Sequence, residues 1–342
     1  MKILIVRPDG IGDLVVSLPI ATQIRQQLPD AKIGFLVNAI TAPILTNHPD
    51  VDFVKIIKLD APLRERMQAF SKDIEAVIFL KPFKELMWPA FLAQTPIRIA
   101  TGYRLRSLLA NRRIYEHRSD CSKHEAEYNL SLLKGLGLTP SNLIPPQLAM
   151  TVSELNTGEK YWKTTHKPRI IIHPGGISSR HWRSIHYQNL ALNLSLQGYS
   201  VILTGSKQER IDFEKESFTE NTTSPDITNL MGQLSLRDLM SVIATSQVVV
   251  SASTGPAHLA GALGAATVSL FDPRRSSLPE RWKPLGQGIL LSPEVPTCEK
   301  CIGEACPYWD CLDRIKVTEV AYQITQLIAN RHLQTELKII HL

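Results

Sequence analysis

Short apolar runs alternate with helical patterns along nearly the whole chain of 342 residues. In the first half, strand-like runs occupy residues 2–8, 31–38 and 74–82, and helical spacing covers Leu14–Leu28. Strands buried on both faces of a parallel sheet read as continuous apolar runs, and parallel strands need long crossovers between them. The alternation therefore predicts parallel α/β layers.

A polar stretch near residues 155–168 separates this first series of predicted strands and helices from a second series. The second series has predicted strands at 169–176, 199–206, 247–253 and 265–273, and predicted helices at Ile185–Gln197, Gln208–Glu216, Leu236–Ala244 and Pro256–Leu263. Because domains usually hold roughly 100–200 residues, we predict two Rossmann-like domains, 1–160 and 161–342. Helical spacing after Lys316 predicts a closing helix, but spacing alone does not tell which domain it covers.

The start of the chain is apolar but does not read as a targeting segment. Its apolar run is too short for a signal peptide, and Asp9, Gly10 and Asp13 interrupt it. The sequence holds no run of roughly 18 apolar residues, so we expect no transmembrane segment. We therefore expect a cytoplasmic protein.

Basic residues gather in one segment of the first half. The formal net charge is +6, and residues 98–118 hold six arginines but a single acid, Glu116. Such a patch suits phosphates, anionic lipid or nucleic acid, and the alternative is an ordinary solvated surface. Nucleic acid is the weaker interpretation, because the segment contains no recognisable nucleic-acid-binding module.

Two glycine-rich turns follow predicted strands of the second series. Gly175 and Gly176 let backbone N–H groups approach an anion, and Arg180 follows them closely. Thr254 and Gly255 open a predicted helix, whose N-terminus favours a diphosphate. Neither turn matches the dinucleotide or NTPase glycine fingerprints, which disfavours both of those classes. The alternative for each is an ordinary tight turn between a strand and a helix.

Three separated motifs occur in order along the chain: "ILIVRPDGIGDLVVSLPIATQ", "HPGGISSRHW" and "STGPAHLAGALGAATVSLFDP". Together they resemble glycosyltransferase family 9, the bacterial heptosyltransferases. The resemblance implies a GT-B architecture, in which two Rossmann-like domains with parallel sheets face a central cleft. It implies that the first domain binds the acceptor and the second binds the nucleotide-sugar.

The same resemblance implies a reaction and its partners. The expected reaction is the inverting, metal-independent transfer of heptose from an ADP-activated donor to a lipid A-linked lipopolysaccharide core. The expected partners are ADP-heptose as donor and a lipid-linked acceptor at the inner face of the cytoplasmic membrane, without nucleic acid and without a required cofactor.

Site residues follow from the resemblance position by position. Asp13 corresponds to the base that removes the acceptor proton, a role that inverting transfer requires. A helix cap for a helix beginning at Leu14 is the other interpretation of Asp13, whereas Asp9 matches no role. The predicted donor-binding residues are Gly12, Gly175, Gly176, Ser179, Arg180, Glu209, Thr254, Gly255 and His258. Arg104 and Arg106 of the basic segment are predicted to bind the acceptor.

Two positions depart from the family pattern. Arg180 stands where members commonly have Lys, and Ser253 stands where many have Asp. Without that acid the donor sugar can differ from heptose. Two alternatives therefore stay open: a related transferase using another nucleotide-sugar for a different surface polysaccharide, and a noncatalytic protein that binds a nucleotide-sugar or glycolipid.

Four of the five cysteines lie close together as Cys298, Cys301, Cys306 and Cys311. Their spacing is compatible with a structural metal site, an iron–sulfur cluster or a loop of reduced thiols. A cytosolic setting disfavours disulfides. We expect no catalytic metal, and the cysteine cluster is the one candidate for a structural one.

Overall fold

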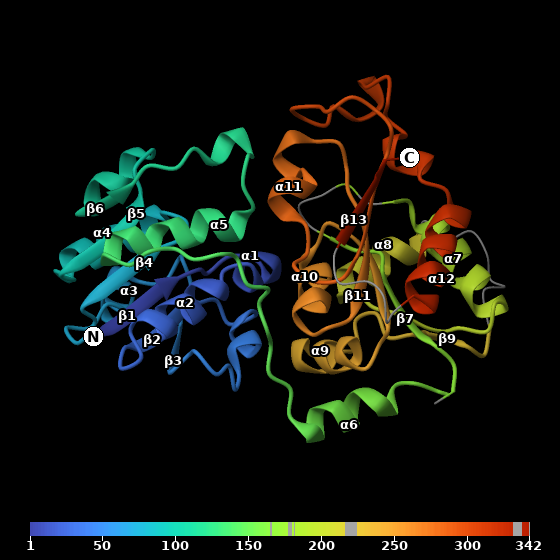
Figure 1. Cartoon of the computed structure of the whole chain (residues 1–342), viewed down its shortest axis with the longest axis horizontal. Helices are drawn as coiled ribbons and strands as arrows, with labels where there is room; N and C mark the ends of the chain where they lie inside the picture. The colour runs from blue at the N-terminus through green and yellow to red at the C-terminus, as the bar shows by residue number, and fades with distance from the viewer. Residues whose placement is uncertain (165, 177–179, 181, 216–223, 331–336, 342) are drawn as a thin grey trace. The chain divides into compact units, whose positions relative to one another are not determined.

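The computed structural model describes residues 1–164, 166–176, 180, 182–215 and 224–330, and the backbone of 337–341. The chain divides into two compact units, unit 1 over Met1–Ala149 and unit 2 over Met150–Leu342 (Figure 1). Helix α6 (Val152–Lys160) lies within unit 2, since it packs against α9 (Leu236–Ala244). The sequence had placed it in the first domain.

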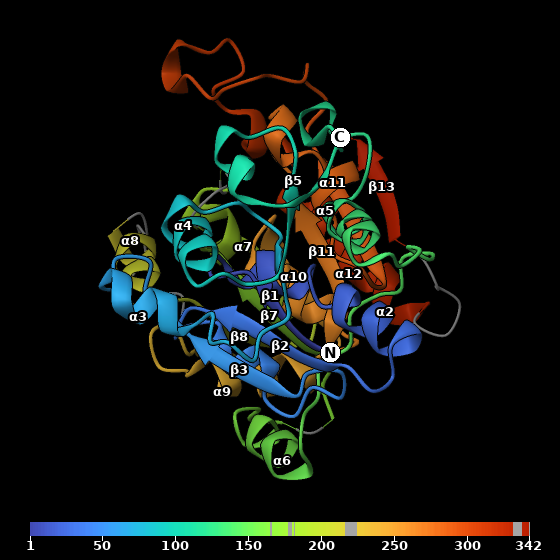
Figure 2. The same ribbon diagram turned by 90° about the vertical axis from the view of Figure 1, so that its left-hand side faces the viewer.

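Unit 1 is built on a sheet of six parallel strands in the order β3-β2-β1-β4-β5-β6. Its strands are β1 (Lys2–Val6), β2 (Lys32–Val37), β3 (Phe53–Ile56), β4 (Ala76–Phe79), β5 (Ile97–Thr101) and β6 (Arg112–Ile114). Its helices are α1 (Ile11–Val15), α2 (Pro19–Gln27), α3 (Leu63–Gln68), α4 (Lys84–Leu92) and α5 (Glu125–Leu130). Figure 2 shows α3 and α4 on one side of this sheet and α2 and α5 on the other.

Unit 2 has a parallel sheet of seven strands in the order β13-β12-β11-β10-β7-β8-β9. Its strands are β7 (Arg169–His173), β8 (Ser200–Leu203), β9 (Ile227–Asn229), β10 (Val248–Ala252), β11 (Ala266–Leu270), β12 (Gly288–Ser292) and β13 (Leu337–His341). Besides α6 and α9, its helices are α7 (Ser184–Leu196), α8 (Lys207–Lys215), α10 (Gly255–Ala262), α11 (Pro279–Trp282) and α12 (Val317–Ala329).

Both sheets contain the strand order of the Rossmann fold, and the predicted α/β fold with two parallel sheets is confirmed. In unit 1 the order reverses between β1 and β4, and in unit 2 it reverses between β7 and β10. Ligands of such sheets bind outside the carboxyl ends of the strands at this switch point. The loops after these four strands are therefore the places to look for a site.

The predicted helix over Leu14–Leu28 is wrong in its extent, because two helices occupy the segment. Helix α1 ends at Val15, and α2 begins at Pro19. The ring of Pro19 has no N–H to donate to a preceding turn, so a continuous helix cannot carry its hydrogen-bond ladder across this point. Because of this break, the first loop and α1 form one short segment between β1 and α2.

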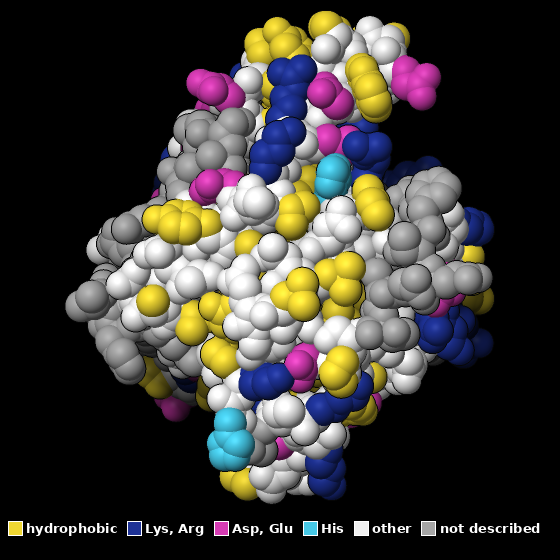
Figure 3. Space-filling model, turned by 90° about the vertical axis from the view of Figure 1, so that its right-hand side faces the viewer, with side chains coloured by type: hydrophobic (Ala, Val, Ile, Leu, Met, Phe, Trp, Pro, Cys, Tyr) yellow, Lys and Arg dark blue, Asp and Glu magenta, His cyan; other side chains and the backbone are white. Residues whose placement is uncertain are grey.

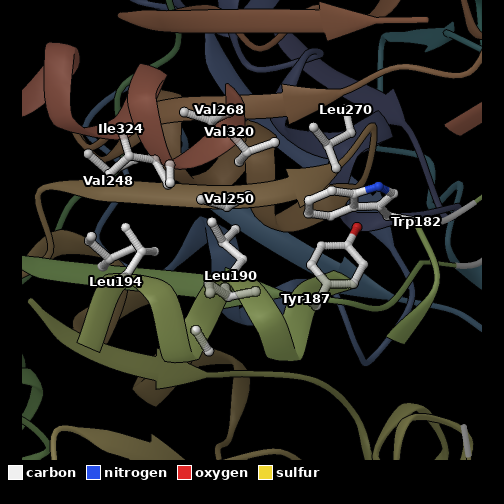
Figure 4. Close-up of a cluster of buried hydrophobic side chains, with 14 of the residues drawn as sticks. Trp182, Tyr187, Leu190, Leu194, Val248, Val250, Val268, Leu270, Val320 and Ile324 are labelled. Carbon is white, nitrogen blue, oxygen red and sulfur yellow. The ribbon is translucent and has the colours of Figure 1, made fainter. Parts of the chain in front are cut away.

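The core of unit 2 explains where the closing helix packs. Leu190 and Leu194 of α7 face the strands, and Val320 and Ile324 of α12 pack into the same buried cluster (Figure 4). Trp182 lies in this cluster and donates its indole N–H to the Ile315 carbonyl at 3.1 Å. The closing helix thus belongs to unit 2, a choice that helical spacing left open.

Within the part of the chain that the structure describes, we find no helix that combines the length and the apolar character needed to cross a bilayer.

A half-buried ion pair attaches α6 to α9 and makes a testable contribution to stability. Arg237 donates to Glu154 at 2.6–2.7 Å, and Glu154 also accepts from the Thr151 N–H at 2.8 Å. Burial by itself would raise the pKa of Glu154, but these partners outweigh it and lower the pKa below its ordinary value. The folded protein therefore binds this proton less tightly than the unfolded chain does.

We expect Glu154→Gln to lower the free energy of unfolding by about 1 kcal/mol at pH 7. The contribution of a carboxylate with a lowered pKa is lost as the pH falls, so the difference from wild type should shrink below about pH 5. Urea unfolding of both proteins at pH 7 and pH 4 measures this. An equal difference at both pH values would contradict the ionic contribution.

Candidate active site

In unit 1, a buried arginine holds three carboxylates at the end of β1. The Arg7 side chain is only 2% exposed and directly follows the strand. Its Nε lies 2.9 Å from Asp9, and its Nη1 lies 3.7 Å from Glu125 of α5. Its Nη2 donates to Asp13 of α1. One guanidinium therefore joins the first loop, α1 and α5.

A second set of contacts surrounds this cluster. Arg118 donates to Glu125 at 2.5 Å, and Lys81, which follows β4, lies 3.5 Å from Asp9. Asn38, which follows β2, donates to the Pro8 and Asp9 carbonyls at 3.0 and 2.7 Å. The loop after β1 is therefore held by the loops after both neighbouring strands.

The pKa values of Arg7 and Asp9 are both raised, which favours the charged form of Arg7 and the neutral form of Asp9. Burial would lower the pKa of Arg7, but Asp9, Asp13 and Glu125 outweigh it and raise the pKa, so the guanidinium stays charged. Burial, together with the nearby Asp13 charge, raises the pKa of Asp9 although Arg7 and Lys81 oppose the change.

Asp13 is the most exposed carboxylate of the three. Its side chain is 31% exposed, against 14% for Asp9 and 2% for Glu125. It lies inside α1, whose N-cap is Gly10, so the interpretation of Asp13 as the cap of a helix beginning at Leu14 is wrong. A Cβ on Gly10 would lie 3.0 Å from Asp13 Oδ2. A carboxylate fixed by an arginine yet open to solvent can accept a proton from a bound hydroxyl.

In unit 2, the turn after β7 packs tightly on a glutamate. A Cβ on Gly175 would lie 2.0 Å from Glu209 Oε1, so any side chain here would have to displace the Glu209 carboxylate. The Ser206 N–H donates to Glu209 at 2.6 Å, and the His173 Nε2 lies 3.9 Å from the same carboxylate. Burial would raise the pKa of Glu209, but His173 and hydrogen bonds from Ser206 and Gly176 outweigh it and lower the pKa. Glu209 is thus held ionised.

The turn after β10 leads into the N-terminus of α10. Thr254 is the N-cap residue, Gly255 is the first helical residue, and Pro256 follows it. Thr254 is buried, and its hydroxyl has no hydrogen-bond partner among the described residues. His258 is buried in the same helix. A helix N-terminus with a spare buried hydroxyl is suited to bind an anion.

Beside this turn, the loop after β11 places a second arginine close to Arg180. The Arg180 N–H donates to Asp272 at 3.1 Å, and Arg274 donates to the same carboxylate at 2.7–3.0 Å. The Arg180 Nη1 lies 3.5 Å from the Cys301 sulfur. The buried carboxylate of Asp272 thus holds the backbone of Arg180 and the side chain of Arg274.

The remaining predicted site residues fall into three groups. Gly12 lies in α1, one residue before Asp13. Arg104 and Arg106 are exposed, and Arg106 donates to the Pro82 carbonyl at 3.3 Å. Ser179 lies outside the described residues.

The four clustered cysteines are free thiols. Burial raises the pKa of Cys298, and so do the charges of Asp272, Cys306 and Cys301 nearby. Burial likewise raises the pKa of Cys311. Among the described residues, no group of three or more His, Cys, Asp or Glu side chains has a geometry that could hold a metal ion.

The model of glycosyltransferase family 9 (heptosyltransferase) matches residues 76–310 of the chain. The chain belongs to glycosyltransferase family 9. The lipopolysaccharide heptosyltransferase 2 of Escherichia coli K12 is 28% identical over 297 residues, which cover 80% of this chain and 83% of that protein. The predicted family is therefore confirmed, and so is the prediction of a glycosyltransferase.

Solved structures support the fold of this family 9 glycosyltransferase. The ADP-heptose lipopolysaccharide heptosyltransferase II of E. coli has a TM-score of 0.81 at 22% identity, covering 97% of this chain and all of that one. The E. coli heptosyltransferase WaaC with ADP-2-deoxy-2-fluoro heptose has a TM-score of 0.69 at 19% identity, covering 97% of this chain and 100% of that one. The predicted GT-B architecture is confirmed.

Several residues at these strand ends escaped the sequence analysis. Arg7 and Glu125 organise the unit 1 cluster, and Asp272 and Arg274 organise the loop after β11. Only the motif "RPDGIGD" carried a signal, because it places Arg7 at a strand end beside two acids. No sequence signal pointed to the pairing of Glu125 with Arg7, since the two residues are 118 positions apart along the chain.

We expect Arg7→Met to lower the free energy of unfolding by about 3–5 kcal/mol, because it removes the buried cation that Asp9, Asp13 and Glu125 share. Arg7→Lys keeps the charge and should cost less. The matched control is Arg210→Met, which removes an exposed pair with Glu214 and should cost well under 1 kcal/mol. Denaturant unfolding measures all three, and an Arg7→Met variant as stable as Arg210→Met would contradict the buried role of Arg7.

Proposed function

We propose that this protein is an inverting glycosyltransferase that transfers heptose from ADP-heptose to a lipid A-linked lipopolysaccharide core. The observation that carries the proposal is Asp13, a partly exposed carboxylate fixed by buried Arg7 at the switch point of unit 1. The relatives support the sugar, because their names describe lipopolysaccharide heptosyltransferases. The lipid-linked acceptor places the reaction at the inner face of the cytoplasmic membrane.

The chemistry assigns one step to Asp13. Its carboxylate accepts the proton of the acceptor hydroxyl, and the oxygen forms a bond to the anomeric carbon from the side opposite the diphosphate. The bond from that carbon to the diphosphate oxygen breaks, and ADP leaves with the electron pair. The sugar passes through an oxocarbenium-like state and its configuration inverts.

Unit 2 supplies the donor site in this proposal. The N-terminus of α10, with Thr254 and Gly255, meets the diphosphate, and its dipole favours the charge that grows as ADP leaves. His258 in the first turn and Arg180 beside Asp272 add to this site. The contact of Ser179 with a donor phosphate stays a prediction, because Ser179 lies outside the described residues.

Glu209 is assigned to the ribose of the donor. Its carboxylate is held by Ser206 and kept ionised, and its remaining lone pairs can accept hydrogen bonds from two ribose hydroxyls. Gly175 has no Cβ to collide with this carboxylate, and we assign the backbone at Gly175 and Gly176 to the donor phosphates. The base Asp13 needs no metal ion to accept a proton, so we propose transfer without a metal cofactor.

A related transferase that uses another nucleotide-sugar is the second candidate. Ser253 favours it, because many members carry Asp at this position and Ser has no carboxylate to bind sugar hydroxyls. The roles of Asp13 and of the diphosphate turn are the same in both candidates. A screen of ADP-, UDP- and GDP-sugars by thermal shift decides between them.

We expect Asp13→Asn to lower kcat by roughly 10²–10⁴-fold, the usual contribution of a general base. The change removes the proton acceptor but keeps the size of the side chain, so the affinity for ADP should change little. Initial rates and calorimetry with ADP measure both, with and without a chelator, which should make no difference. Near-wild-type rates would overturn the assignment of Asp13.

The contrasting variant is Gly175→Ala in unit 2. Its methyl group displaces the Glu209 carboxylate, so ADP affinity should fall by roughly tenfold, about 1.4 kcal/mol. Asp13→Asn and Gly175→Ala should therefore separate catalysis from donor binding. Equal loss of ADP affinity in both would contradict the division of roles between the two units.

We expect the double change Arg104→Gln and Arg106→Gln to weaken acceptor binding more than donor binding, because both arginines are exposed in unit 1. The difference from wild type should shrink as salt rises, since exposed charges are screened. Steady-state KM values for each substrate at low and high salt test this. A matching loss for the donor would contradict the acceptor role.

A further inference from the structure

Large apolar side chains are exposed where α4 packs against the short helix η2 (Leu105–Leu109) of unit 1. Leu105 is 86% exposed, Leu108 65% and Trp88 49%. The same surface includes Phe91 and Leu92 of α4, which are also exposed. We call these five residues the α4–η2 surface. Exposed apolar side chains that gather in this way mark an interaction site.

Basic side chains stand among these residues. Lys84 opens α4, and Arg104 and Arg106 flank Leu105, and all three are exposed. The Arg98 guanidinium lies over the Phe91 ring, 5.4 Å from its centroid. The acid of α4 is Glu85, which is half-buried. The surface thus joins apolar groups to a net positive charge.

We propose that the α4–η2 surface docks on an anionic lipid bilayer. Leucine and tryptophan side chains insert at the boundary of headgroups and acyl chains, while lysine and arginine bind the anionic headgroups. Tryptophan with one apolar face and one polar edge favours this boundary. The charge of Lys84, Arg104 and Arg106 makes lipid of negative charge the complementary partner.

The topology places the start of this surface at the same carboxyl end of the unit 1 sheet as Asp13. Helix α4 follows β4, the neighbour of β1, and η2 follows β5, the next strand in the sheet, so both elements come after the carboxyl ends of strands on this half of the sheet. The contact between Lys81 and Asp9 ties the loop after β4 to the loop after β1. Docking there brings a lipid-linked acceptor to the base, and this part of the inference rests on the proposed function.

Unit 2 offers a matched control. Leu196, the last residue of α7, is 89% exposed, like Leu105, but it lies outside the α4–η2 surface. Figure 3 shows a face on the unit 2 side, where apolar and basic side chains are scattered among polar ones. A general effect of placing a charge at an exposed leucine should therefore appear equally in Leu196→Glu.

The test is sedimentation of the full chain with vesicles. Wild-type protein should bind vesicles of phosphatidylglycerol and phosphatidylethanolamine, and bind much less to phosphatidylcholine. The double variant Leu105→Glu and Leu108→Glu should lose roughly tenfold or more in partitioning, whereas Leu196→Glu should bind like wild type. Thermal unfolding should be unchanged, because all three leucines are exposed.

A second measurement distinguishes a loss of membrane docking from damage to the proposed active site. With a water-soluble acceptor lacking its lipid, the double variant should turn over at a rate like that of wild type. Wild-type protein that fails to bind anionic vesicles, or equal losses for the double variant and Leu196→Glu, would overturn the proposal. Vesicle binding is measured without any transfer reaction. A failure of the proposed function can therefore be distinguished from a failure of membrane docking.

Discussion

The buried guanidinium of Arg7 is the interaction on which the unit 1 site depends. It is one cation shared by Asp9, Asp13 and Glu125, residues from the first loop, α1 and α5. A buried charge is tolerated only when it is paired, so the three acids and the arginine require one another. Because Asp13 is the most exposed of the acids, the same network that stabilises the fold also presents a carboxylate to solvent.

The two units place their charged and polar side chains at equivalent positions of the same fold. Each has a parallel sheet with the strand order of the Rossmann fold, and each places its charged residues at the carboxyl ends near the switch point. In unit 2 the groups differ: Glu209 is held beside Gly175, and α10 presents its N-terminus with Thr254. In the proposed function, this fold, present in both units, supplies a proton acceptor in unit 1 and an anion site in unit 2.

Arg180 contacts two other segments of unit 2. Its N–H binds Asp272, which also holds Arg274, and its side chain contacts Cys301 in the cysteine-rich loop. A planar guanidinium can bind two oxygens of a phosphate at once, which a lysine cannot. The paired arginines link the cysteine-rich loop to the proposed donor site.

The sequence by itself determined the α/β class, the two series of strands and the turns at Gly175 and Thr254, because these depend on local patterns of apolar residues and glycine. It also singled out Asp13, whose motif lies in one continuous segment. Only the tertiary structure decided that Arg7 pairs with Glu125 and that α12 packs in unit 2. These pairings join residues far apart along the chain, and no local pattern records which distant side chain will balance a buried charge or cover an apolar face.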